Sequence, residues 1–255
     1  MFVDSHCHLD WFGEEAGKVL ARAGEKDVRA VVSCATNPES IAKNLALAQK
    51  FSRGKCGVFV CLGLHPSDLL RMKKAEIEAG IESVRKNCGA RGVVGAGEVG
   101  LDYKHATAPA QKKKQQKVFA EFIQIAKEKN LPLVVHSRFA ERETMELLRK
   151  HRAERVVMHW FTNSVQSVKT AEDLGFFYTA GPAILHYADA AKVAAKMRLE
   201  NLMLETDAPV EFAGKRAEPS WIPRLAEKAA ELHGTKAAEI EKTTTKNAKA
   251  FFGFA

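Results

Sequence analysis

Two histidines near the start of the chain have the spacing of a metal-binding pair. His6 and His8 are separated by one residue, and because residues i and i+2 of an extended segment point to the same face, both imidazoles can reach one ion. Cys7 points the opposite way and is therefore a poor ligand candidate, despite its soft sulfur. Imidazole and carboxylate groups together suit divalent metals, so other groups of these types bear on the same site.

Further imidazole and carboxylate groups stand at the ends of short apolar runs. Counting the first pair, the residues that share this placement are His6, His8, His65, Glu98, His136, His159 and Asp207. A single histidine at a strand end is more often structural, but five histidines with two acids favour a metal site. Asp207 ends a hydrophobic run, where an acid is costly to bury without the partner that a metal would supply.

The segment GAGEVGLD at residues 95–102 places Glu98 among glycines, which let the backbone turn sharply or approach a ligand closely. The glycines disfavour a helix, so Glu98 is not expected to be an acid of a helix start. A carboxylate has two oxygens, and Glu98 can therefore bridge two cations. Asp4 and Asp10 are expected to accept hydrogen bonds from the second ring nitrogen of the ligating histidines.

The elements that would position these groups alternate between short apolar runs and longer amphipathic ones. The runs are rich in Val, Leu and Phe without polar alternation, which is typical of parallel strands buried on both faces. The predicted strands span residues 2–4, 29–34, 57–64, 92–97, 132–136, 155–159, 176–179 and 201–205. The predicted helices span residues 39–51, 74–86, 112–130, 141–150, 164–174, 187–197 and 220–233. Asn37 and Thr107 stand before prolines near two helix starts and are the expected N-caps.

Eight predicted strands that alternate with helices require parallel pairing through helical crossovers and define an α/β fold. Residues 1–255 have the size of a single (β/α)8 TIM barrel, and no linker or change in composition divides them. An open doubly wound sheet is the competing arrangement, which the number of strands alone does not exclude. In a barrel, the site is built at the C-terminal ends of the strands, which is where we expect the candidate metal ligands to meet.

Composition excludes several classes of protein and leaves a globular one. The 255 residues are 46% hydrophobic and 27% charged, which argues against disorder, a collagen-like fibre and a disulfide-stapled mini-protein. The net charge of +8 suits a polyanionic partner such as nucleic acid, although charge alone favours an ordinary basic protein.

We expect a cytoplasmic protein that does not enter a membrane. The five cysteines are an odd number without a CxxC pair, which favours reduced thiols. The first residues lack the basic and apolar segments of a signal peptide, and no run approaches about 18 apolar residues. No obligate protein partner is evident from the sequence.

Six short segments form an ordered set along the chain. They are DSHCHLD at 4–10, GLHP at 63–66, GEVGLDY at 97–103, HSR at 136–138, HWF at 159–161 and ETDAP at 205–209. Together they resemble the TatD-type metal-dependent deoxyribonucleases, a branch of the amidohydrolase-like superfamily. The resemblance implies a (β/α)8 barrel. The ligands it implies are His6, His8 and Asp207 for one ion, His136 and His159 for a second, and Glu98 for both. Many other amidohydrolase-like relatives bridge the metals with a carboxylated lysine, so Glu98 favours the TatD-type branch.

The resemblance also implies an activity. It is the exonucleolytic hydrolysis of phosphodiester bonds of DNA by a water activated between two divalent ions, which are Mg, Mn or Zn. Asp207 would also accept the proton of that water, and Glu98 would join it in catalysis as the bridging group. His65 and Arg138 would contact the phosphate, with a loop histidine and a surface salt bridge as alternatives of equal weight.

Departures from the family pattern fall at Ser67, Lys104 and residues 179–183, and they bear on the identity of the substrate. Two other functions are therefore kept. One is another amidohydrolase-like activity on a small amide, ester or phosphoester. The other is a catalytically silent binding barrel, which would predict a broken ligand set, whereas all six ligand positions are filled.

Overall fold

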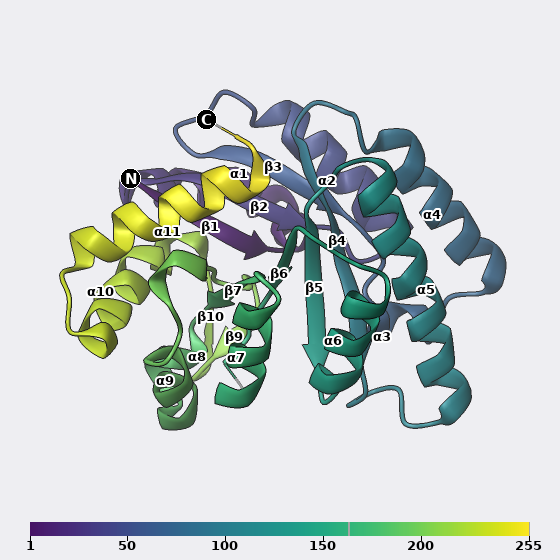
Figure 1. Ribbon diagram of the computed structural model, residues 1–255. Coiled ribbons are helices and arrows are strands. Elements are labelled where there is room, and N and C mark those ends of the chain that lie inside the picture. The colour runs from purple at the N-terminus through teal and green to yellow at the C-terminus, as the bar shows by residue number, and fades with distance from the viewer. Residues whose placement is uncertain (163, 255) are drawn as a thin grey trace.

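Eight parallel strands form one sheet in the computed structural model, which describes residues 1–162 and 164–254 (Figure 1). The strands are β1 (Phe2–Cys7), β2 (Val28–Cys34), β3 (Gly57–Leu62), β4 (Val93–Asp102), β5 (Leu133–Arg138), β6 (Val156–Met158), β7 (Phe177–Ala180) and β8 (Leu202–Leu204). They pair in chain order from β1 to β8. Helices lie outside the strands in Figure 1, as parallel pairing through crossovers requires.

The connections between the strands are mainly helical. The α-helices are α1 (Ala16–Glu25), α2 (Pro38–Lys50), α3 (Pro66–Leu69), α4 (Lys74–Asn87), α5 (Pro109–Glu128), α6 (Glu141–Lys150), α7 (Val165–Asp173), α8 (Ala183–His186), α9 (Ala188–Ala194), α10 (Ile222–His233) and α11 (Ala237–Phe252). Short 3-10 helices are η1 (Leu9–Glu15), η2 (Leu199–Asn201) and η3 (Pro219–Trp221). After β8, strands β9 (Glu211–Phe212) and β10 (Lys215–Arg216) form an antiparallel hairpin.

Hydrogen bonds join the two ends of the sheet. The backbone N–H of Asp207, which follows β8, donates to the carbonyl of His6 in β1 at 3.0 Å. The hydroxyl of Ser5 donates to the carbonyl of Leu204 at 2.8 Å. Because consecutive strands are neighbours throughout and the first meets the last, the predicted (β/α)8 barrel is confirmed and the open doubly wound sheet is excluded.

Strand β4 runs further than the sequence predicted, to Asp102 instead of residue 97, so Glu98 lies within the strand and not beyond its end. Glycines permit a close approach of β4 to β5. At Gly100, φ is +142° and a Cβ would lie 2.0 Å from the carbonyl oxygen of His136. No L side chain fits there, and glycine therefore lets Glu98 and His136 stand on adjacent strands.

The two predicted N-caps had different outcomes. Asn37 caps α2, where its side chain accepts a hydrogen bond from the N–H of Ser40 at 3.0 Å, as predicted. The prediction for Thr107 is wrong, because the residue before α5 is Ala108. There the side chain of Gln111, in the first turn of α5, accepts a hydrogen bond from the backbone N–H of Ala108 at 3.0 Å. A residue inside the helix therefore caps its start.

Some elements were not anticipated. Helices α1 and α11 were missed because glycines at positions 17 and 24 weaken the pattern of α1, and three consecutive threonines at 243–245 lower the propensity of α11. The helix predicted over 187–197 is confirmed as α9, which is shorter than predicted, and the short helix α8 just before Tyr187 was not anticipated. Hairpin β9–β10 was also missed, since each of its strands has only two residues.

Apolar faces of the helices cover the barrel. In α5, Phe119, Phe122 and Ile123 have the predicted helical spacing, and all three are buried. Burying a side chain of this kind contributes about 1.5–3 kcal/mol. All five cysteines are free thiols, and four of them are buried. Within residues 1–162 and 164–254, none of the helices has the length and apolar character needed to cross a bilayer.

Replacing Gly100 with Ala is expected to lower the free energy of unfolding by about 2–4 kcal/mol, because the new Cβ must displace the carbonyl of His136 at a positive φ. Chemical denaturation followed by circular dichroism measures this change. The matched control is Gly89→Ala, where a Cβ meets nothing within 4 Å and the expected change stays within about 1 kcal/mol. Equal losses in the two variants would contradict the close approach of β4 to β5.

Candidate metal centre

The carboxylate of Glu98 lies at the mouth of the barrel and is only 1% exposed. Its two oxygens face different groups of nitrogens. Oε2 lies 3.3 Å from Nε2 of both His6 and His8. Oε1 lies 2.9 Å from Nδ1 of His136 and 2.9 Å from Nε2 of His159. One buried carboxylate therefore contributes an oxygen to each of two clusters of ligand-type atoms.

Strand β1 and the segment after β8 complete the first cluster. As predicted, the strand pleat puts His6 and His8 on one face, while Sγ of Cys7 points toward the carbonyl of Val32 at 3.7 Å. Asp207 Oδ1 lies 3.5 Å from Nε2 of His6 and 3.3 Å from Nε2 of His8. Ligand atoms bound tetrahedrally at about 2.0–2.2 Å stand roughly 3.3–3.6 Å apart, so this spacing suits one ion.

Asp207 reaches the first cluster through a left-handed backbone conformation. Its φ is +49°, a region in which Asp is one of the commoner non-glycine residues. Its N–H donates to the carbonyl of His6, and its own carbonyl accepts the N–H of Val210, both at 3.0 Å. These two bonds hold the backbone that aims the carboxylate at His6 and His8.

Strands β4 and β5 and the residue after β6 supply the second cluster. Nδ1 of His136 and Nε2 of His159 lie 3.1 Å apart, and both face the same oxygen of Glu98. The rings of His6 and His159 stack with centroids 4.0 Å apart and planes 13° apart, so the two clusters are in direct contact.

Several buried polar atoms of the first cluster have no hydrogen-bond partner among the described residues. They are both ring nitrogens of His6, Glu98 Oε2 and Asp207 Oδ1. The two clusters and their immediate neighbours include four buried carboxylates, those of Glu98, Asp102, Glu205 and Asp207. In the part of the chain that the structure describes, none of these four pairs with Lys or Arg. Buried charges of one sign need a compensating partner, and this donor set of imidazoles and carboxylates fits divalent cations.

The same excess of negative charge controls the protonation of the histidines and carboxylates in the two clusters. Burial lowers the pKa of His8, but hydrogen bonds to Asp207 and Glu98 outweigh it and raise that pKa to about 10. Burial raises the pKa of Glu98, but the charges of nearby imidazoles, with His159 first, hold it well below its usual range. The carboxylates thus stay charged and attract cations. A metal that binds there must displace protons from the imidazoles.

Acceptors orient the second ring nitrogen of several histidines. Nδ1 of His8 lies 2.9 Å from the carbonyl oxygen of Cys34. Nε2 of His136 lies 3.4 Å from Oδ2 of Asp102, which also contacts Nδ1 of His105 at 2.9 Å. Burial raises the pKa of Asp102, but hydrogen bonds from His136 and His105 lower it further, so this acceptor is charged. Such acceptors fix the ring and leave the other nitrogen bare.

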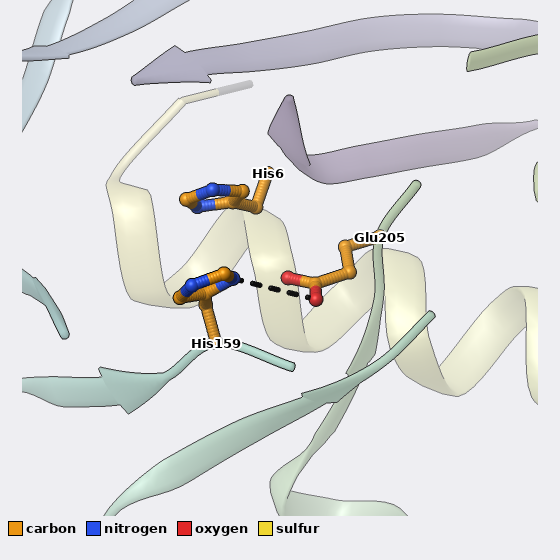
Figure 2. Close-up of side chains that lie close together, drawn as sticks. All are labelled: His6, His159 and Glu205. Atoms are coloured by element: carbon orange, nitrogen blue, oxygen red, sulfur yellow. Dashed lines mark ion pairs between the residues drawn. The ribbon is translucent and has the colours of Figure 1, made fainter. Parts of the chain in front are cut away.

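Figure 2 shows Glu205 facing His159, with the ring of His6 stacked on that of His159. Oε1 of Glu205 lies 3.5 Å from Nδ1 of His159 and accepts the backbone N–H of Trp160 at 2.8 Å. A neutral imidazole has one bare nitrogen, and for His159, whose Nδ1 faces Glu205, it is the Nε2 that faces Glu98. Glu205 therefore lies where it can orient the ring of His159.

The roles expected for Asp4 and Asp10 are wrong. Oδ1 of Asp4 accepts the backbone N–H of Thr206 at 3.0 Å, which ties β1 to the segment after β8. Burial raises the pKa of Asp4 to about 7, although hydrogen bonds from Thr206 oppose the shift. Oδ2 of Asp10 accepts a hydrogen bond from the hydroxyl of Ser40 at 2.7 Å. Both acids stabilise the backbone around the site and do not orient a ligand ring.

Asp102 and Glu205, which sequence reasoning missed, are the acids that lie near the second ring nitrogens of His136 and His159, at 3.4 and 3.5 Å. Each is a buried acid at the end of an apolar run. That placement is the signal that singled out Glu98 and Asp207, and it would have found Asp102 and Glu205 had it been applied to every such acid.

His65 lies beside the second cluster. It caps α3, and its Nδ1 accepts the N–H of Ser67 at 3.1 Å. Its Nε2 lies 3.3 Å from Oε1 of Glu98 and 3.3 Å from Nδ1 of His136. A neutral imidazole whose Nδ1 accepts carries its proton on Nε2, so His65 presents a donor here and is not a further ligand. The hydroxyl of Ser67 also lies 2.7 Å from Nδ1 of His65, so the departure at Ser67 places a side chain against the ring of His65.

A cavity of about 430 Å³ opens over the two clusters. Arg138, the exposed last residue of β5, lines it together with His65. Ser67 and Trp160 also line it, and the Trp160 N–H donates to the hydroxyl of Thr179 at 2.8 Å, so two of the three departures touch the cavity wall. The structure brings all eight site residues predicted from the sequence to this one mouth of the barrel.

Known proteins are similar to this chain in sequence and in fold. A family model described as TatD related DNase matches residues 3–253. The human protein Deoxyribonuclease TATDN3 is 32% identical over 262 residues, which cover 98% of this chain and 94% of that protein. The uncharacterized metal-dependent hydrolase YabD of Bacillus subtilis is 31% identical, covering 99% of each chain. The crystal structure of YjjV, a TatD homolog from Escherichia coli K12, has a TM-score of 0.88 and 30% identity, covering 100% of this chain and 98% of that one. The chain is a metal-dependent hydrolase that belongs to the TatD-related DNase family.

Proposed function

We propose that this protein hydrolyses phosphodiester bonds of DNA, from the end of a strand, with two divalent ions of Mg, Mn or Zn. The observation that carries the proposal is the division of Glu98 between two clusters of ligand atoms. The proposed ligands of one ion are His6, His8 and Asp207, those of the other are His136 and His159, and Glu98 joins both.

Three observations support DNA as the substrate. The human relative that is 32% identical is named a deoxyribonuclease. The cavity offers an exposed guanidinium at Arg138 and an N–H donor at His65, both suited to phosphate oxygens. The net charge of +8 favours a polyanion.

The size of the cavity bears on where the strand is cut. A cavity of about 430 Å³ accommodates a nucleotide-sized group, which suits removal of nucleotides from a strand end.

The side chains that line or surround the cavity have different proposed roles in hydrolysis. Two divalent ions, when bound, would supply a water of lowered pKa and would neutralise charge on the phosphodiester. Asp207 accepts a proton from the attacking water, since it is a buried carboxylate at the cavity wall. His65 and Arg138 donate hydrogen bonds to the phosphate oxygens that do not leave. Asp102 and Glu205 keep the rings of His136 and His159 in place.

The proposal is tested by metal analysis of the purified protein together with a panel of substrates. End-labelled oligonucleotides, plasmid DNA and chromogenic esters are each incubated with stripped protein after add-back of Mg, Mn or Zn. Metal-dependent shortening of the oligonucleotides from an end is expected. Turnover of the esters alone would contradict the proposal and favour a small amide, ester or phosphoester as substrate, and metal binding without any turnover would favour a silent binding barrel.

His136→Ala is expected to bind one divalent ion fewer than the unchanged protein and to lose DNA hydrolysis by at least about 100-fold, because the second cluster keeps only two proposed ligands. Inductively coupled plasma mass spectrometry counts the ions, and a labelled oligonucleotide measures the rate. His151→Ala is the matched control, since His151 follows α6 and does not line the cavity. Full activity in His136→Ala would rule out the two-ion assignment.

Asp102→Asn is expected to weaken binding of one of the two ions by about 10- to 100-fold, because His136 loses a charged acceptor at its Nε2. Metal titration of stripped protein measures both dissociation constants. Asp189→Asn serves as the control, because the Asp189 side chain is 94% exposed and pairs with Lys192 on the same helix. An unchanged pair of dissociation constants in Asp102→Asn would show that Asp102 does not position His136.

A further inference from the structure

Trp11 is an exposed tryptophan at the wall of the cavity. It lies in η1, directly after β1, and 51% of its surface is accessible. One face of its indole stacks on the ring of His8, with centroids 4.5 Å apart and planes 14° apart. Because His8 covers one face, the accessible area belongs to the opposite face and the edges. Trp11 lines the same cavity as Arg138 and His65.

The backbone that carries this indole is fastened on both sides. The N–H of Trp11 donates to the carbonyl of His8 at 3.1 Å. The guanidinium of Arg216, on hairpin β9–β10, donates to the carbonyl of Trp11 at 3.2 Å and lies 4.3 Å from the ring centroid of the adjacent Phe12. The indole is thus held in place before any ligand arrives, which reduces the entropy that a ligand would lose on stacking.

A flat, open aromatic face fixed beside a hydrolytic site suits a flat ligand group. The proposed substrate places a nucleobase next to every phosphodiester, and each base can stack on an indole regardless of its identity. We infer that Trp11 stacks on a nucleobase that flanks the bond being cut and is the residue that makes the site prefer nucleic acid over other phosphodiesters. This inference rests on the proposed function, and it names Trp11 as the residue that recognises the base of the substrate.

The chain offers a clear contrast to Trp11. Tyr187 is also an exposed aromatic residue, 57% accessible, but it lies between α8 and α9 and does not line the cavity. Trp160 does line the cavity, but its ring packs on Phe212 at 5.0 Å and is only partly accessible. Trp11 therefore combines cavity position with an open face, and Tyr187 provides the matched control.

The test compares Trp11→Leu, Trp11→Tyr and Tyr187→Ala, each as the metal-loaded protein with its ion content measured. The Leu side chain still packs on His8 but offers no aromatic face, whereas Tyr restores one. Trp11→Leu is expected to raise KM for a labelled oligonucleotide by roughly 5- to 100-fold with kcat little changed, the size of effect that one lost base stack gives. Trp11→Tyr is expected to recover most of the loss, and Tyr187→Ala to match the unchanged protein.

A second substrate separates base stacking from a general effect on the site. In this oligonucleotide, tetrahydrofuran abasic nucleotides replace the terminal nucleotides at both ends. The unchanged protein is expected to show a raised KM for it, and Trp11→Leu to add no further rise. An equal loss on both substrates would overturn the inference, as would an unchanged KM in Trp11→Leu. A change from oligomer to monomer in Trp11→Leu with unchanged KM would identify a protein contact in place of the base.

Direct binding keeps this inference separate from the proposed function. Fluorescence anisotropy with an oligonucleotide that carries phosphorothioate linkages at its ends gives Kd without turnover. Binding that weakens in Trp11→Leu, in a protein that does not cleave DNA, would support stacking and refute the proposed function. Cleavage of DNA with a Kd that is the same in Trp11→Leu would refute stacking alone.

Discussion

Burial of the Glu98 carboxylate sets the conditions that the rest of the barrel mouth must meet. A charge removed from water is tolerated only when compensating partners lie near it, and imidazole nitrogens lie 2.9 Å from Oε1 and 3.3 Å from Oε2 of Glu98. The partners come from β1, β5 and the residue after β6, so strands from different parts of the barrel must converge on one side chain. Gly100 makes this arrangement possible, because the absence of a side chain lets β4 pass close to the backbone of His136.

A second layer of acids gives the imidazoles their direction. Asp102 and Glu205 face the ring nitrogens of His136 and His159 that point away from Glu98. The site is therefore negative both inside and behind its histidines, and cations relieve the repulsion. Binding of a metal and the ordering of these rings are then one process, because each ring can ligate only in the orientation that its acceptor selects.

The barrel fold and the residue types of the candidate metal site could be predicted from the sequence, since both follow from local patterns. Alternating apolar runs predicted the strands, and polar residues at their ends predicted the cluster. Which acid meets which ring nitrogen depends on three-dimensional directions, so Asp4 and Asp10 were assigned wrongly on sequence proximity alone. Trp11 carried no signal in the sequence, because only the structure shows that its ring stacks on His8 and lines the cavity.

The seam between β1 and β8 has a consequence for the synthesis of the protein. The ligands proposed for the first ion are His6 and His8 from the first strand and Asp207 from beyond the last. A nascent chain on the ribosome exposes the histidines early but cannot supply the acid until nearly the whole barrel has emerged. Under the proposed ligand assignment, a fragment released by premature termination before the eighth strand lacks the acid of the first ion's site.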